Sequence, residues 1–126
     1  MAIHRKIDKA EKLVYTRCSG PITLKDIELY IHNTWGDRSY YGFYELFDIT
    51  QGDWENFEFS YLFTIAKRVA ALDTIDPNSK LALVALKGKQ MELMDFYKNA
   101  KAMLPVKSRE IEAFYSQEEA IKWLET

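Results

Sequence analysis

The chain has 126 residues, the size of one ordinary domain, because two cores of about 60 residues each would both be marginal. Apolar residues make up 48% and charged residues 29%, which is a globular and not a disordered composition. The net charge of -2 excludes a strongly basic nucleic-acid-binding protein by bulk charge. The single cysteine, Cys18, excludes an intrachain disulfide framework and a cysteine-based zinc site.

The N-terminal residues carry charges without an apolar stretch behind them, so we expect no secretory signal. The longest apolar run, 81–86, is too short to span a bilayer. We therefore expect a cytoplasmic protein with Cys18 reduced, its simplest role being a small strand side chain.

The first half of the chain begins with two short strands, 3–7 and 12–18, which a polar link joins into a hairpin. Ser19, Gly20 and Pro21 end the second strand. Thr23 is expected to cap a helix over 24–34, with Asp26 three residues further on. Its apolar residues recur at helical spacing.

The middle of the chain is expected to form a strand at 44–49 and a helix at 61–72, with Ser60 as a candidate N-cap. The triplet 76–78 predicts a turn. The strand expected at 80–86 is apolar without alternation, which is typical of a strand covered on both faces.

The last third predicts a helix over 89–103 that ends before Pro105, a strand over 107–114 and a helix over 117–125. Ser116 and Glu119 form a capping box for the last helix. The predicted order is ββαβαβαβα, which indicates a single α/β domain over 1–126 with a mostly parallel sheet flanked by helices.

This order resembles the SpoIIAA-like fold, which includes the STAS domains, and is most similar to the small stand-alone SpoIIAA-like proteins of bacteria. The segments that carry the resemblance run nearly from end to end: 15–23, 46–50, 65–70, 80–85, 109–114 and 118–124. The resemblance implies a non-enzymatic regulatory or protein-interaction module. In anti-sigma factor antagonists of this fold, a partner kinase phosphorylates a serine at the start of the helix after the third strand. The nearest serine here is Ser60, and the Asp-Ser pair of that pattern is missing.

Ten of the 18 aromatic residues fall within 40–63, which exceeds what one strand and one helix face can bury. Four of them follow the strand at 44–49 and are predicted to line an interaction patch or pocket: Trp54, Phe57, Phe59 and Tyr61. The alternative is a compact loop folded over the edge of the sheet.

Asp48 ends its strand, and sites in open parallel sheets gather beyond the carboxyl ends of strands, so Asp48 and Ser60 are candidates for a strand-end site. The simpler interpretations are that Asp48 anchors the following loop and that Ser60 caps a helix. The Lys87–Lys89 loop lacks the spacing of a phosphate-binding loop.

No catalytic, cofactor-binding or metal-ligating set is predicted. His4 and His32 lie on different elements without ligands at metal-binding spacing. The first hypothesis for function is a protein-interaction module, either a homodimer or bound to an unknown protein. A domain that binds a lipid or small molecule in an apolar pocket is the second. An enzyme based on Asp48 and the Lys87–Lys89 loop is the third.

Overall fold

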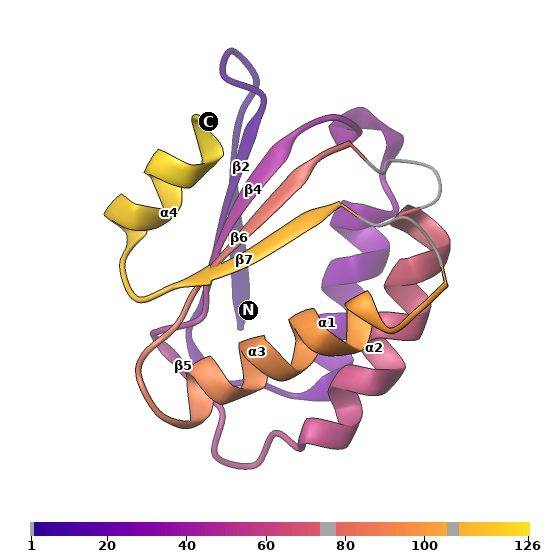
Figure 1. Cartoon of the computed structure of the whole chain (residues 1–126), viewed down its shortest axis with the longest axis vertical. Coiled ribbons are helices and arrows are strands. Elements are labelled where there is room, and N and C mark those ends of the chain that lie inside the picture. Colours follow the sequence, from indigo (N-terminus) through magenta and orange to yellow (C-terminus); the bar gives the residue numbers. More distant parts are fainter. Residues whose placement is uncertain (1, 74–77, 106–108) are drawn as a thin grey trace.

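Five strands form one sheet in the order β1-β2-β4-β6-β7 in the computed structural model, which describes residues 2–73, 78–105 and 109–126 (Figure 1). The strands are β1 (Ile3–Asp8), β2 (Leu13–Cys18), β4 (Tyr44–Asp48), β6 (Lys80–Val84) and β7 (Glu110–Phe114). β1 runs antiparallel to β2, and every other pair is parallel. The expected α/β class with a mostly parallel sheet is confirmed.

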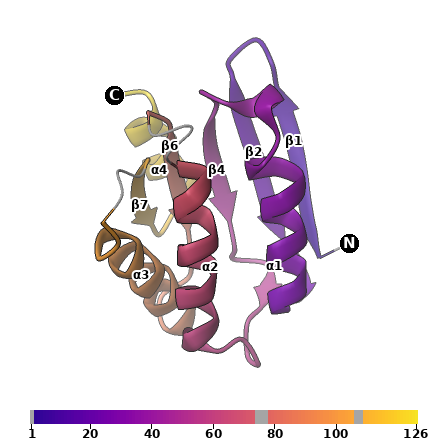
Figure 2. The same ribbon diagram turned by 90° about the vertical axis from the view of Figure 1, so that its right-hand side faces the viewer.

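Three helices cover one face of this sheet: α1 (Leu24–Tyr30), α2 (Phe59–Asp73) and α3 (Lys89–Ala102) (Figure 2). The last helix, α4 (Gln117–Leu124), lies on the opposite face and packs against β4, β6 and β7. Two short segments, β3 (Gly20–Pro21) and β5 (Gly52–Asp53), form a separate parallel pair. Apart from this small pair and two short helical turns, Ile31–Trp35 and Arg38–Tyr40, the described elements follow the expected order.

The alternation of side chains along each strand divides the interior into two parts. A large core lies between the sheet and α1, α2 and α3, and Cys18 and Phe47 belong to it. A smaller core lies under α4, where Leu46 and Val84 meet Leu124. Residues 81–85 are all buried, as expected for a strand covered on both faces.

The helix starts follow the capping chemistry of the sequence. The Thr23 side chain accepts from the Asp26 amide and the Asp26 side chain accepts from the Thr23 amide, so the capping box is complete. The Ser116 hydroxyl likewise accepts from the Glu119 amide at 3.2 Å. Both expected helix starts are confirmed.

The first helix differs from the continuous helix expected over 24–34. Its α-helical part ends at Tyr30, and a π-helical turn follows over Ile31–Trp35. The Gly36 amide donates to the Ile31 carbonyl at 2.9 Å, which closes this wider turn. This turn ends at Trp35, whose indole nitrogen donates to Glu45 on β4.

The starts of α2 and β7 also differ from the expectation, and β6 ends at Val84 instead of residue 86. α2 begins at Phe59, so Ser60 lies inside the helix and the expectation that it is the N-cap is wrong. The strand expected at 107–114 spans Glu110–Phe114; positions 107 and 108, like positions 76 and 77 of the expected turn, lie outside the described residues. No helix in the described ranges combines the length and apolar character needed to cross a membrane.

Candidate functional site

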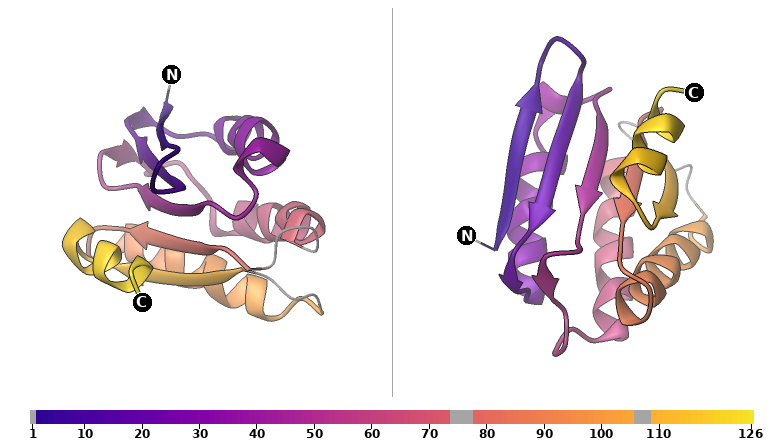
Figure 3. Two further views of the ribbon diagram at one scale, coloured as in Figure 1. Left: turned by 90° about the horizontal axis from the view of Figure 1, so that it is seen from above. Right: turned by 90° about the vertical axis from the view of Figure 1, so that its left-hand side faces the viewer.

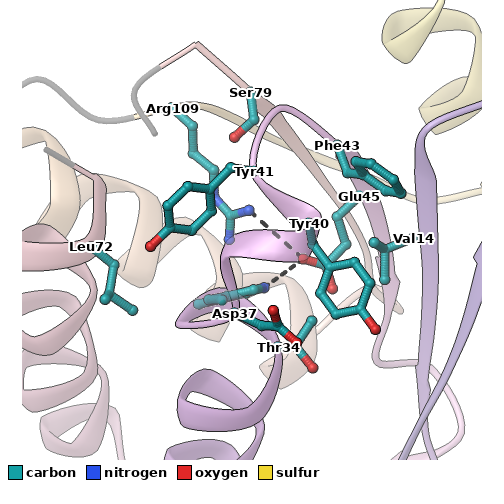
Figure 4. Close-up of a pocket in the computed structure, with 11 residues that line it drawn as sticks. Val14, Thr34, Asp37, Tyr40, Tyr41, Phe43, Glu45, Leu72, Ser79 and Arg109 are labelled. Atoms are coloured by element: carbon teal, nitrogen blue, oxygen red, sulfur yellow. Dashed lines mark hydrogen bonds and ion pairs between the residues drawn. The ribbon is translucent and has the colours of Figure 1, made fainter. Parts of the chain in front are cut away.

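Most of the buried polar side chains of the described residues gather around Glu45 at the amino ends of the parallel strands (Figure 4). Glu45 is the second residue of β4, and only 2% of its surface is exposed. Its Oε2 atom accepts hydrogen bonds from the hydroxyls of Thr16 and Tyr30. Its Oε1 atom accepts from Trp35 Nε1 at 2.6 Å. One carboxylate on β4 is therefore bonded to β2, α1 and the π-helical turn after α1.

Arg109 supplies the positive charge of this cluster. Its Nη1 atom lies 3.7 Å from Glu45 Oε1, and its guanidinium carbon lies 4.3 Å from the centre of the Trp35 ring. The side chain is 9% exposed, and Nε and Nη2 have no hydrogen-bond partner in the described part of the chain. The cavity beside it, which Ser79 and Tyr41 help to line, has a volume of about 30 Å³.

This geometry suits a structural brace better than a reaction centre. A cavity of about 30 Å³ has room for about one water molecule. Burial, followed by the charge of Glu45, raises the pKa of Tyr30 well above its usual value. Tyr30 therefore remains a hydrogen-bond donor to the carboxylate.

The contacts at the carboxyl ends of the strands give the expected strand-end site of Asp48 and Ser60 no support. Asp48 Oδ1 accepts from the amide and hydroxyl of Thr50 at 2.8 and 2.6 Å, and Oδ2 accepts from Gln117 at 2.7 Å. These contacts match the simpler interpretation, in which Asp48 anchors the following loop. The strand order from β2 to β7 never reverses, and crevices at the carboxyl ends of parallel sheets form where it does.

Ser60 is exposed on the first turn of α2, and its hydroxyl lies 3.4 Å from Glu58 Oε2, to which it donates. A phosphate on Ser60 would lie next to this carboxylate, where like charges repel. The local chemistry therefore gives Ser60 no support as a phosphate acceptor.

The predicted aromatic patch requires correction, because the structure buries two of its four members. Trp54 is 5% exposed and donates from Nε1 to the Ile49 carbonyl at 3.0 Å, while Phe57 is 2% exposed. Neither ring is presented to a partner. Phe59 and Tyr61 are partly buried against the same core. The segment after β4 is thus a loop folded inward over the edge of the sheet.

Trp54 and Phe57 line an apolar cavity between the sheet and the helices. A pocket was the second possibility that the sequence left open for these rings. Its volume is about 50 Å³. Pockets for drug-sized ligands span about 300–1,000 Å³, so a lipid chain does not fit. The cavity gives no support to a lipid carrier.

The other candidates considered from the sequence are Cys18 and the two histidines. Burial, and then the charge of Asp48, raises the pKa of Cys18 to about 12, so the thiol stays protonated. His4 lies 3.3 Å from the Ser19 hydroxyl. Within the described ranges, no three His, Cys, Asp or Glu side chains are arranged to hold a metal ion.

Two surface hollows that are larger than the cavities described above both border β1. One, of about 480 Å³, runs between β1 and α1; Leu29 and Arg5 are among the residues that line it. The other, of about 690 Å³, lies on the outer face of the hairpin, where Lys6, Tyr15 and Arg17 meet the start of α4. Figure 3 shows that α4 leaves the outer face of β1 and β2 uncovered.

Comparison with known proteins identifies the fold. A crystal structure of an uncharacterized protein from the DUF3478 family, with a SpoIIAA-like fold, from Shewanella loihica PV-4 matches with a TM-score of 0.57. The match covers 98% of this chain and 94% of the other, at 16% identity. The chain has the SpoIIAA-like fold. No family model matches the sequence, and no curated protein matches it significantly, so the SpoIIAA-like assignment concerns the fold alone.

Two features of this SpoIIAA-like chain escaped the sequence interpretation. The first is the Glu45 cluster, whose signal was a glutamate at the second position of β4, directly before the apolar residues Leu46 and Phe47. The second is the basic run His4-Arg5-Lys6 on an edge strand. Its charge is visible in the sequence, but its place at the edge of the sheet follows only from the strand order.

Proposed function

We propose that the chain is a non-enzymatic protein-interaction module that binds an acidic partner through the β1–β2 hairpin. The observation that carries this proposal is the basic run on β1, which lies between two grooves and is uncovered on its edge and outer face. The SpoIIAA-like fold is compatible with such a role but does not by itself supply it.

The charge of the hairpin supports an acidic partner. Residues 3–18 hold five of the 17 Lys and Arg residues and two of the 19 Asp and Glu residues. This segment is therefore positive by three, in a chain whose net charge is -2. Complementary charge speeds encounter and selects partners of opposite sign.

The same charge disfavours a second copy of the chain at this edge. Pairing of β1 with β1 would place two His4-Arg5-Lys6 runs against each other, and like charges on facing strands are destabilising. A homodimer through β1 is thus less favourable than a complex with an acidic protein.

The test selects binders from a displayed library of random twelve-residue peptides. We expect the selected peptides to be rich in Asp and Glu and to lose at least tenfold in affinity to the double variant Lys6→Glu, Arg17→Glu. The matched control is Lys67→Glu, Lys87→Glu, which makes the same change in net charge on exposed residues of α2 and the loop after β6.

The control variant should bind the peptides as the unmodified chain does. Peptides that bind both variants equally well would overturn the proposal, as would a library that yields no acidic binder. Urea unfolding of both variants checks that the hairpin is still folded.

A further inference from the structure

The hydrogen-bond pattern of β1 shows which of its backbone groups are available. Ala2 and Ser19 face each other across the hairpin, and the Ser19 amide donates to the Ala2 carbonyl at 2.8 Å. Bonded and non-bonded pairs alternate in antiparallel strands, so the amides and carbonyls of His4 and Lys6 face β2. Those of Ile3, Arg5 and Ile7 point away from the sheet, because β1 is its terminal strand among the strands described.

The groove beside this edge is built by one strand and one helical segment. One wall is formed by residues 2–5, which include the start of β1. The other is the face of α1 and the following turn that carries Asp26, Leu29 and Asn33. Leu29 is 50% exposed there. An extended peptide that adds to a sheet edge places alternate side chains in such a groove, so backbone bonds hold it and the groove selects its sequence.

Arg5 supplies a cation at one end of the groove. Its guanidinium donates to the Thr34 hydroxyl and to the Asn33 carbonyl, and both acceptors are neutral. No carboxylate of a described residue lies within ion-pair distance of it. The pKa of Asp37 is lowered mainly by the hydrogen bonds from Ser39. The charge of Arg5 is a smaller cause of that shift.

Resting on the proposed function, we infer that the acidic partner binds as an added strand on the outer edge of β1, in the groove between β1 and α1. Residues directly opposite each other on paired strands share one face of the sheet. A partner residue opposite Ile3 thus meets Leu29 and is apolar, and the residue opposite Arg5 carries a carboxylate. One residue separates the two, whichever direction the added strand runs.

The experiment compares Arg5→Pro with Arg5→Ala, using the tightest acidic peptide from the library selection. Both variants lose the side chain, but only proline removes the outward amide, a change that edge strands tolerate. We expect Arg5→Pro to weaken binding at least tenfold relative to Arg5→Ala. Ala113→Pro is the matched control, because the β7 register points the amide of Ala113 away from β6 at the opposite edge.

Equal affinities for Arg5→Pro and Arg5→Ala would overturn strand addition, while charge-dependent binding of the same peptide would leave the proposed function standing. A second readout uses peptides in which single backbone amides are methylated. Alternate positions should lose affinity at least tenfold, and a peptide that tolerates methylation at every position would overturn the inference even if a proline variant failed to fold.

Discussion

Breaking the buried pair of Glu45 and Arg109 should cost a large part of the stability of the fold. Both side chains are more than nine-tenths buried, and their charged atoms lie 3.7 Å apart. At an effective dielectric constant of about 20, this separation corresponds to about 4 kcal/mol of attraction. Removing one member of a buried pair generally costs about 3–5 kcal/mol, because the other charge stays buried without its partner.

The assay is urea unfolding of Glu45→Gln, Arg109→Met and the double variant. Each single variant should lose about 3–5 kcal/mol, against a total of about 5–15 kcal/mol for a typical domain. The double variant should lose less than the sum of the singles by at least about 2 kcal/mol, because it leaves no unpaired buried charge. Trp35→Phe, which removes the hydrogen bond to Oε1 and keeps an aromatic ring beside Arg109, is the milder variant if a single fails to fold.

Losses below about 1 kcal/mol for both single variants would refute this reasoning. Additive losses in the double variant would show that the two side chains act independently, which contradicts the brace. Either result would mean that water screens the cluster far better than its burial indicates.

Three further predictions concern the core and the caps. Burial raises the pKa of the Cys18 thiol from 9.0 to about 12 in the folded chain. The contribution of Cys18 to stability is therefore constant below pH 9 and falls above it, because the unfolded chain loses the proton first. At about pH 10–11, the free energy of unfolding should fall more steeply than in Cys18→Ala, by about 1.4 kcal/mol per pH unit, and parallel slopes would contradict the shift. Gly52→Ala should cost about 1–3 kcal/mol in urea unfolding, because its new Cβ would lie 2.6 Å from Trp54 Nε1. An unchanged unfolding midpoint would contradict this close contact. Ser116→Ala should cost about 1 kcal/mol through the lost bond to the Glu119 amide, with Ser116→Asp as the conservative control, and equal stability of both variants would count against the cap.

The fold followed from the sequence because its signals are local. Hydrophobic periodicity and the caps at Thr23 and Ser116 depend on residues within one or two turns of each other. The π-helical turn at Ile31–Trp35 did not follow, since it depends on a contact between Trp35 and a strand ten residues away. Helical spacing alone cannot report that contact.

The site was harder to predict because burial depends on packing between distant segments. The sequence shows ten aromatic rings within 40–63, but it does not show that the loop after β4 folds inward and buries Trp54 and Phe57. Asp48 was predicted as a site residue because sites in open parallel sheets lie beyond the carboxyl ends of the strands. Among the described strands, the order does not reverse, so no crevice of that kind opens there.

Amide hydrogen exchange along β1 tests the central claim most directly. In the free chain, the amides of His4 and Lys6 should exchange slowly and those of Arg5 and Ile7 quickly, because only the first two face β2. Adding the selected acidic peptide should slow exchange at Arg5 and Ile7 while His4 and Lys6 change little. Fast exchange at Arg5 and Ile7 in a saturated complex would contradict the account.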